Sequence, residues 1–394
     1  MRILAIETSC DETAMAVVEC SGGHAYRLPV GRQGRQGLKN PRFKVLKNVV
    51  SSQIETHRPY GGVVPLLAKR EHIGNLPVVF QQIQGKSKNE KVEMSEIDMI
   101  AVTVGPGLEP ALLTGIEFAK DLSKKLKKKL VGANHLEGHL YSFLLTQKTE
   151  MPNNKKHPVK RGKNGKSQMT NAFPAVGLIV SGGHTILLLM DRLESWKKIG
   201  ETRDDAVGEA FDKVARMLGL PYPGGPEIEK IAKNGNSHAI EFPRPMIHHK
   251  NFDFSFAGLK TAVYYELMDA ERRGLHADQR GNSQRKSASS PRESAFRSDV
   301  AASFQEAAAE VLVKKTMRAV ETFGAKSVIL AGGVAANTKL RNTLRDECKK
   351  LKKQFFVSDL KYSGDNAAMI AAATYINLLR KKTYRVQMQA NLNL

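Results

Sequence analysis

Two histidines separated by three residues, His135 and His139, are the clearest candidates for metal chemistry in this sequence. If the segment is helical, both imidazoles lie on one face of the helix at a spacing that can share one metal ion. Two helix histidines that merely pack or cap explain the bare pattern equally well. Glu137 would lie about 200° around such a helix from His135 and face away from the metal. Because a metalloprotease carries its general-base glutamate directly after the first histidine, protease chemistry is disfavoured.

A third metal ligand is expected, and a carboxylate is the natural choice beside two imidazoles. Asp365 stands in the segment Ser363–Asn366, at the start of the last helix that the sequence predicts. It is the best-placed carboxylate, so the predicted metal ligands are His135, His139 and Asp365.

Turns rich in glycine or small residues could cradle phosphate, because glycine allows positive φ and lets backbone N–H groups approach oxygen atoms. An isolated glycine pair is more often an ordinary turn. Here two candidates fall in hairpins at corresponding points of the two halves, and another lies between a strand and the start of a helix. A nucleotide held between two lobes is therefore expected. The four candidates are Thr8–Thr13, Gly105–Gly107, Ser181–Gly183 and Gly332–Gly333.

The hydrophobic pattern predicts an alternation of strands and helices in which the second half repeats the first. Predicted strands are Ile3–Glu7, Met15–Glu19, Val45–Ser51, Ile97–Val104, Leu130–Ala133, Ala175–Val180, Thr185–Met190, Trp196–Ile199, Val328–Ala331 and Phe355–Asp359. Predicted helices are Pro65–Gln84, Ala111–Lys128, one from His135, Gly208–Leu218, Pro226–Lys233, Val300–Thr322, Asn337–Leu351 and Ala367–Leu379.

The length of 394 residues suggests two domains. We expect an N-terminal lobe at 1–146 that carries the histidine pair, a basic linker at 147–171, and a C-terminal lobe at 172–364 with a basic insertion near 274–293. Residues 365–394 are expected to form a final helix that packs back on the N-terminal lobe. The linker and the insertion are polar and should serve contact with a partner.

Lys plus Arg number 61 against 39 Asp plus Glu, which gives a net charge of +22 and points to a polyanionic partner such as nucleic acid. A solubility device is the plain alternative. The charge gathers in Lys124–Lys129, Lys155–Lys166 and Arg272–Arg297 with few aromatic residues, so contact with phosphates is better supported than base stacking.

Three cysteines without metal-type spacing favour a reducing compartment. The first residues show no charged leader or cleavage site, and no apolar run is long enough to span a bilayer. We therefore expect a cytoplasmic protein that makes no contact with membranes.

A set of motifs distributed over nearly the whole chain resembles the TsaD family, the tRNA threonylcarbamoyladenosine transferases, in the family's order. The motifs are Glu7–Thr13, Tyr60–Pro65, Gly105–Leu108, His135–His139, Val180–Thr185, Asp204–Lys213, Tyr222–Pro226, Phe254–Thr261, Ala331–Asn337 and Asp365–Met369. The resemblance implies a duplicated α/β fold of the actin-like (ribonuclease H-like) ATPase type, with the ligand in the cleft between two lobes.

The resemblance also implies a reaction. The threonylcarbamoyl group passes from threonylcarbamoyl-adenylate to N6 of the adenosine 3′ of the anticodon, in tRNAs that read codons beginning with A, and AMP is released. His135, His139 and Asp365 would bind one divalent metal per subunit, usually iron, with zinc as the alternative. ATP or AMP could occupy the same cleft. By the same resemblance, the residues that hold the adenylate are Ile179, Val180, Ser181, Gly182, Gly183, Asp212, Gly225 and Asn337.

Asp212 and Asn337 have plain alternatives as a helix surface charge and a helix cap. Asp11 and Glu12 lie in the first candidate phosphate turn, where bare carboxylates would repel phosphate, so we expect them to orient groups or to accept a proton from the attacking amine. Cys10 fits there as a small residue in a tight turn, because the reaction needs no covalent nucleophile.

The family implies partners besides tRNA, namely an inactive paralogue and a small ATPase. The chain departs from the family's bacterial pattern in added segments near Ser21–Arg42, 147–171 and 274–293, and in Asn134, where a histidine is common. Three alternatives remain open: a small-molecule kinase of the same fold, a metallopeptidase, and a catalytically silent partner subunit.

Overall fold

A computed structural model describes residues 1–22, 25–26, 37–38, 41–85, 92–146, 172–274 and 291–394. The basic segment Lys155–Lys166, most of the predicted insertion at 274–293 and much of Ser21–Arg42 lie outside the described residues. Among the residues described, no helix combines the length and the apolar character needed to cross a membrane.

The first of two five-stranded sheets belongs to the N-terminal half and has the order β5-β2-β1-β6-β7. β1 pairs antiparallel with β2 and parallel with β6, so a hairpin is followed by parallel crossovers. Its strands are β1 (Arg2–Glu7), β2 (Glu12–Ser21), β5 (Arg42–Ser52), β6 (Met99–Gly105) and β7 (Lys129–Asn134). A short two-stranded ribbon, β3 (Ala25–Tyr26) with β4 (Gly37–Leu38), is separate from it.

The second sheet, in the C-terminal half, has the equivalent order β10-β9-β8-β11-β12. β8 pairs antiparallel with β9 and parallel with β11, as β1 does with β2 and β6. This repetition confirms the predicted duplicated α/β fold. Its strands are β8 (Ala175–Val180), β9 (Thr185–Arg192), β10 (Ser195–Glu201), β11 (Ser327–Ala331) and β12 (Gln354–Val357).

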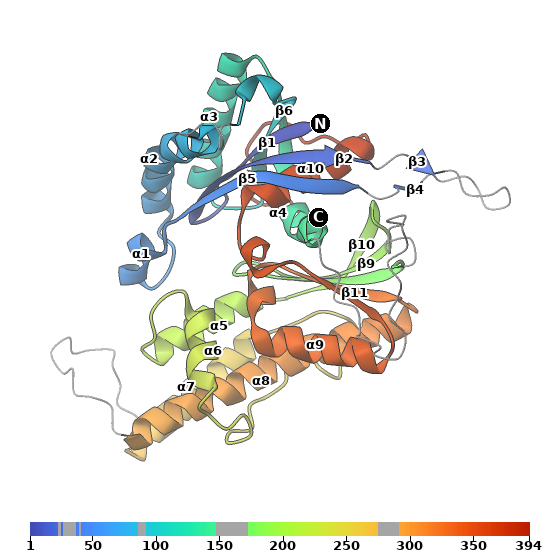
Figure 1. Cartoon of the computed structure of the whole chain (residues 1–394). Helices are drawn as coiled ribbons and strands as arrows, with labels where there is room; N and C mark the ends of the chain where they lie inside the picture. The colour runs from blue at the N-terminus through green and yellow to red at the C-terminus, as the bar shows by residue number, and fades with distance from the viewer. Residues whose placement is uncertain (23–24, 27–36, 39–40, 86–91, 147–171, 275–290) are drawn as a thin grey trace.

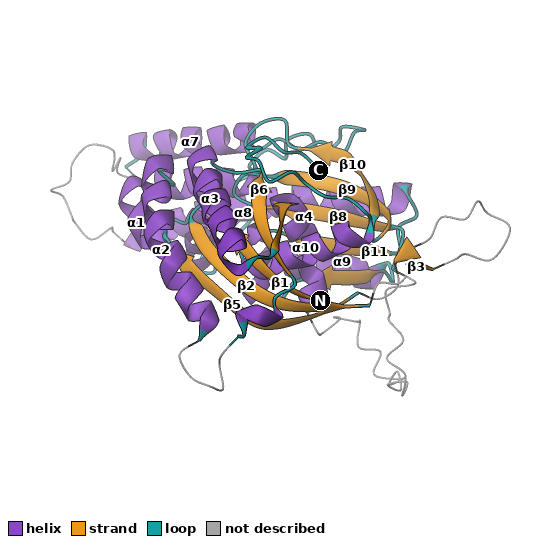
Figure 2. Cartoon of the chain, turned by 90° about the horizontal axis from the view of Figure 1, so that it is seen from above, coloured by secondary structure: helices purple, strands orange, loops and turns teal. Residues whose placement is uncertain are grey.

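Helices cover the outer faces of both sheets, and α4 (His135–Tyr141) and α10 (Ala367–Leu379) lie between the sheets (Figures 1 and 2). The α-helices are α1 (Ile54–His57), α2 (Pro65–Gln84), α3 (Glu109–Leu126), α4 (His135–Tyr141), α5 (Val207–Met217), α6 (Gly224–Ala232), α7 (Ala257–Arg272), α8 (Pro291–Thr322), α9 (Thr338–Lys350) and α10 (Ala367–Leu379). Short 3-10 turns are η1 (Arg58–Tyr60), η2 (Met94–Glu96), η3 (Ser142–Leu145), η5 (Gly333–Ala336) and η6 (Leu360–Tyr362).

Alternation along β1 explains how the N-terminal sheet packs on both faces. Leu4 and Ile6 face outward to a core that includes Leu76 of α2 and Ile116 of α3. Ile3 and Ala5 face inward, into a core shared with α4, α10 and the C-terminal sheet. Since every second residue of a strand points to the same face, a fully apolar strand is what a sheet covered on both sides requires.

The inner core draws on both halves of the chain. Leu136 and Leu140 of α4 and Ile370 of α10 share it with Ile179 of β8 and Ile329 of β11. α10 contacts β1, β2 and α4, so the last helix lies against the N-terminal sheet. The lobe boundaries at 146, 172 and 364 stay a prediction.

Some elements differ from the sequence prediction. The helices α1 and α7 and the short strands β3 and β4 were not predicted, and α8 begins at Pro291 rather than near Val300. Proline is favoured in the first turn of a helix, where its missing N–H has no intrahelical partner, so Pro291 is a natural start. Predicted strands and helices elsewhere in the described ranges agree with the structure within a few residues at most ends.

Candidate metal and nucleotide site

A cavity of about 740 Å³ is lined by residues from both halves of the chain. The N-terminal half supplies the loop between β1 and β2, the turn after β6, and His135. The C-terminal half supplies the turn between β8 and β9, the N-terminal parts of α5 and α6, the turn after β11, and the segment before α10. The lining residues that the sequence analysis had singled out are Cys10, Asp11, Glu12, Gly107, His135, Ser181, Gly182, Gly183, Asp212, Gly225, Gly333, Asn337 and Asp365.

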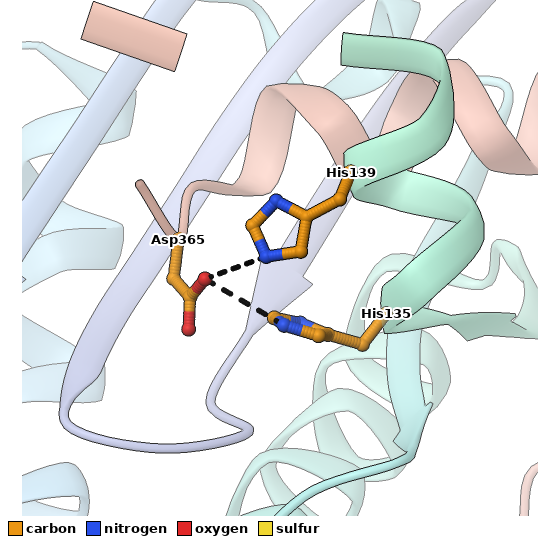
Figure 3. Close-up of side chains that lie close together, drawn as sticks. All are labelled: His135, His139 and Asp365. Atoms are coloured by element: carbon orange, nitrogen blue, oxygen red, sulfur yellow. Dashed lines mark ion pairs between the residues drawn. The ribbon is translucent and has the colours of Figure 1, made fainter. Parts of the chain in front are cut away.

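The side chains of the three predicted metal ligands converge on one point (Figure 3), and two of them, His135 and Asp365, also line the cavity. Nε2 of His139 lies 3.0 Å from Oδ1 of Asp365, and Nε2 of His135 lies 3.6 Å from the same oxygen. The ligand atoms of all three residues fall within 4.8 Å of one another. Asp365 comes from a segment 226 positions after His139 in the chain, so the fold itself brings the ligands together.

Asparagine caps fix the start of both helices at this site. The side chain of Asn134 accepts hydrogen bonds from the N–H groups of Leu136 and Glu137, at the first turn of α4. Asn366 accepts from Met369 N and starts α10 directly after Asp365. Because a side-chain acceptor satisfies N–H groups that lack a helical partner, each cap defines where its helix begins and thereby where the ligand beside it points.

The second ring nitrogen of His135 is held by Glu7 and Ser9. Nδ1 lies 3.2 Å from Oε2 of Glu7 and 3.1 Å from the Ser9 hydroxyl. A carboxylate only accepts hydrogen bonds, so Nδ1 carries the hydrogen and, in the neutral ring, Nε2 keeps its lone pair toward Asp365. Glu7 is fully buried and also accepts from Thr103 at 2.6 Å. The sequence analysis did not identify Glu7 as the partner of His135. The only feature that marks Glu7 in the sequence is its position as an acidic residue at the end of an apolar strand.

Neighbouring charges and burial have opposite effects on the pKa of His135. Burial alone would lower the pKa of His135, but the carboxylates of Asp365 and Glu7 raise it to about 9. Burial would raise the pKa of Asp365, and His135 and His139 outweigh that effect and lower it. A cation bound at this point would take the place of the proton that the two carboxylates hold on His135.

The residues fit a divalent metal. Both ring nitrogens of His139 are buried without a hydrogen-bond partner within the described residues, although Nε2 is close to Asp365. Two imidazoles and one carboxylate leave coordination positions open, as in catalytic metal sites. An unsatisfied buried imidazole costs free energy that coordination to a metal would recover.

Asp11, in the loop that follows β1, and Glu12, the first residue of β2, both line the cavity. Oδ2 of Asp11 accepts a hydrogen bond from the Tyr222 hydroxyl at 3.2 Å, which joins the two halves of the chain across the cavity. Burial, with the charges of Asp11 and Asp365, raises the pKa of Glu12 well above its usual value. The two acidic residues therefore line the same cavity as the metal ligands His135 and Asp365.

The glycine turns of the two halves are built alike. A Cβ on Gly107, after β6, would lie 2.5 Å from the Ser9 carbonyl oxygen. A Cβ on Gly332, after the equivalent strand β11, would lie 2.3 Å from the Val180 carbonyl oxygen, and φ there is +92°. Only glycine allows the turns after β6 and β11, the fourth strands of their sheets, to approach the hairpins so closely.

Other predicted ligand-binding residues divide into two groups. Gly182, Gly183 and Gly225 line the cavity, and a Cβ on any of them would meet nothing within 4 Å, so space for a ligand is open there. Ser181 lines the cavity as well. Ile179 and Val180 are buried in β8 and support the turn from behind.

Asp212 and Asn337 line the cavity and also have local structural roles. Asp212 accepts from the Gly224 N–H at 2.7 Å, and burial together with the charge of Asp11 raises its pKa to about 6. Asn337 caps α9 by accepting from Leu340 N. The helix cap that was the plain alternative for Asn337 is therefore present, in a residue that also lines the cavity.

His184 is a cavity-lining histidine that the sequence analysis did not select as a site residue. Burial and the nearby His135 and His139 lower its pKa to about 4, so its imidazole is neutral at pH 7. The signal that could have found it is its position directly after the glycine pair of the second hairpin.

The two equivalent sheets, with a cavity lined by residues of both halves, define a duplicated α/β fold of the actin-like type. Solved structures of HypF share the fold: that of T. kodakarensis superposes with a TM-score of 0.52 at 13% identity, covering 98% of this chain and 49% of HypF. Full-length HypF in the phosphate- and nucleotide-bound form gives 0.53 at 12% identity, over 96% of this chain and 46% of that one. This chain spans about half the length of those proteins.

Sequence comparison is more specific. The model of the family TsaD, tRNA N6-adenosine threonylcarbamoyltransferase, matches residues 44–156 and 161–372, and the chain belongs to this family. A relative of that name from Thermosipho melanesiensis is 43% identical over 100% of both chains. A relative of the same name from Thermosipho africanus is 41% identical, over 95% of this chain and 94% of the relative. One from Moorella thermoacetica is 42% identical, over 96% of this chain and 92% of the relative.

Proposed function

We propose that this protein transfers the threonylcarbamoyl group of threonylcarbamoyl-adenylate to N6 of the adenosine 3′ of the anticodon, in tRNAs that read codons beginning with A. The observation that carries the proposal is a His-His-Asp cluster of which His135 and Asp365 line the same cavity as open glycine turns, in a chain of the threonylcarbamoyltransferase family. The protein would then be an acyltransferase that releases AMP.

The cavity supplies the parts that such a transfer needs. Backbone N–H groups in the turns at Gly182, Gly183 and Gly225 would hold the adenylate, because no side chain blocks the approach of a phosphate there. Asp212 and Asn337 would orient the nucleoside by hydrogen bonds. With the adenylate fixed, the reacting carbon is held in one place for the amine, which lowers the entropic cost of reaching the transition state.

A divalent metal, iron or zinc, would be held by His135, His139 and Asp365 and would supply Lewis-acid polarisation of the threonylcarbamoyl group. The amine of adenosine attacks the carbamoyl carbon, the bond from that carbon to the phosphate oxygen breaks, and AMP leaves with the bonding electrons. Asp11 or Glu12 accepts the proton that the amine loses. The Tyr222 hydroxyl holds the Asp11 carboxylate in place for this role.

The net charge indicates a nucleic-acid partner, and exposed apolar side chains on α2 indicate a protein partner. A net charge of +22 favours tRNA as the polyanionic substrate. Leu66 and Ile73, on the solvent side of α2, are 75% and 56% exposed. We propose that an inactive paralogue of the same fold covers the exposed apolar side chains of α2 and that a small ATPase assists, as the family implies.

The three cysteines are free, which agrees with a cytoplasmic location.

Transfer from threonylcarbamoyl-adenylate to unmodified tRNA tests the proposal, with and without the helper subunits. We expect metal-dependent product from the wild type and a loss of at least about a hundredfold in the His135→Ala/His139→Ala variant. The matched control is His248→Ala/His249→Ala, which removes two exposed histidines from the C-terminal half. Absence of product from the wild type even with helpers would favour a silent partner subunit, and phosphorylation of a small molecule would favour the kinase.

A further inference from the structure

A chain of buried polar side chains links the start of α2 to the hairpin of β1 and β2, where Asp11 ends the loop and Glu12 begins β2. Its members are Thr13, Gln53, His57 and His72, and each is at most 2% exposed. They do not line the cavity, so direct contact with a substrate does not account for them. Because buried polar groups are costly unless they are hydrogen-bonded, their bonds must be worked out one by one.

The bonds of His72 define its tautomer. Nε2 lies 3.0 Å from the carbonyl oxygen of Cys10, which only accepts, so Nε2 carries the hydrogen. Nδ1 of the neutral ring is then an acceptor, and it receives the Thr13 hydroxyl at 2.7 Å and Nε2 of Gln53 at 3.2 Å. Burial lowers the pKa of His72, which favours this neutral ring.

The same reasoning extends the chain to the start of α2. Nε2 of His57 lies 3.1 Å from Oε1 of Gln53 and donates to it. Nδ1 of His57 therefore accepts, and it receives the backbone N–H of Val64, the residue before α2, at 3.3 Å. All donors in this path point the same way, from Val64 to the carbonyl of Cys10.

The path ends on the backbone of the loop between β1 and β2. The Gln53 N–H also donates to the carbonyl of Asp11, at 2.9 Å. Two successive carbonyls of the loop are thus held by residues outside it, while the side chains of Asp11 and Glu12 project into the cavity. The direction of those two carboxylates depends on the backbone that these bonds fix.

We propose that His72 is a positioning residue for the transfer reaction. Its Nε2–H bond to the Cys10 carbonyl fixes the loop at 8–13 so that Asp11 and Glu12 present their carboxylates to the cavity beside His135. This inference rests on the proposed function, in which those carboxylates meet the attacking amine.

Two conservative variants separate positioning from simple filling of space. In His72→Gln the side-chain amide reaches the place of Nε2 and keeps a donor for Cys10. In His72→Asn the shorter amide ends near the place of Nδ1 and loses that donor. Each variant would be compared with the wild type by hydrogen exchange of peptides that cover 8–13, by thermal unfolding, and by kcat and KM for transfer.

We expect amide exchange at 8–13 to rise about tenfold in His72→Asn, with kcat down about tenfold and the KM for tRNA changed less than about twofold. His72→Gln should stay within about threefold of the wild type in all of these. Exchange in α5 (Val207–Met217), which lies in the other half of the chain, should not change in either variant.

Equal loss of thermal stability and of kcat in both variants, with wild-type exchange at 8–13, would overturn the inference and leave His72 as a packing residue. Failure of the proposed function gives a different result. The wild type would then form no product, while exchange at 8–13 still separates His72→Asn from His72→Gln.

Discussion

The imidazole of His135 lies between two carboxylates, each of which contacts a different ring nitrogen. Glu7 holds Nδ1 from behind, and Asp365 faces Nε2 from the cavity side. Such an arrangement orients an imidazole and raises its basicity, which strengthens a metal ligand, but it also strengthens proton binding. Metal and proton are therefore alternatives at Nε2, and pH decides between them.

Metal affinity should increase with pH. The pKa of His135 is raised to about 9, so below that value a proton must leave when the metal binds. Release of one proton makes the apparent Kd for Zn²⁺ fall about tenfold per pH unit between pH 6.5 and 8.5. Competition with a fluorescent chelator measures this Kd, and an affinity that is flat over this range would show that no proton is displaced.

Much of the site could be predicted at the scale of residues. The histidine spacing, Asp365 at a helix start and the glycine turns all have local signals, and the structure brings these residues to one cavity. Glu7 and His72 could not be found in this way. Their partners lie 128 and 62 positions away in the sequence, so their roles exist only after the chain has folded.

At the scale of elements, α4 is held on two opposite sides by the segment around α10. One side presents His135 and His139 to Asp365, just before α10. On the other side the fully buried Glu137 accepts from Asn377 and, at 2.9 Å, from Lys382, with Arg380 at 3.5 Å. Glu137 thus faces away from the predicted metal site, as the helical spacing indicated.

Glu137→Gln should destabilise the protein and loosen the metal site. The change keeps the shape but removes the charge opposite Lys382 and Arg380, which are 36% and 20% exposed in their side chains. We expect the free energy of unfolding to fall by about 1–3 kcal/mol, less than for a fully buried pair because solvent screens both cations. Denaturant titration measures it.

Glu117→Gln on α3 is the matched control, since Glu117 is exposed and its loss should cost less than about 0.5 kcal/mol. Equal stability of the two variants would mean that the Glu137 cluster does not fix α4 against α10.

The course of the chain after α10 was not predicted, because it depends on contacts with residues far away in the sequence. After α10 the chain returns to the N-terminal sheet, where Tyr384 bridges to Gly132 and Gln389 N donates to the Val104 carbonyl. A Cβ on Gly105 would lie 1.8 Å from the Gln389 carbonyl oxygen. The C-terminal segment can therefore pack against β6 only because residue 105 is a glycine. The apolar residues of that segment show no helix or strand periodicity. Its backbone path is fixed only by contacts with the edge of the N-terminal sheet.

At the scale of the whole molecule, duplication places one cavity between two similar halves, and charge governs what approaches it. The net charge of +22 should attract tRNA by release of counterions from its phosphates. Six of the positive residues fall in Lys155–Lys166, a stretch that sequence analysis assigned to contact with a partner and that lies outside the described residues.

Replacing the six basic residues of Lys155–Lys166 by Gln, or deleting the stretch, should weaken tRNA binding while leaving the metal and the cavity unchanged. Each lost phosphate contact lowers the slope of log K against log salt by about 0.7–0.9, so a smaller slope is the specific sign of lost contacts. The matched control exchanges each Lys for Arg and Arg161 for Lys, which keeps the charge and should keep the slope. Filter binding at several salt concentrations measures both, and an affinity that stays at the wild-type value at low salt would assign tRNA contact to basic residues elsewhere in the chain.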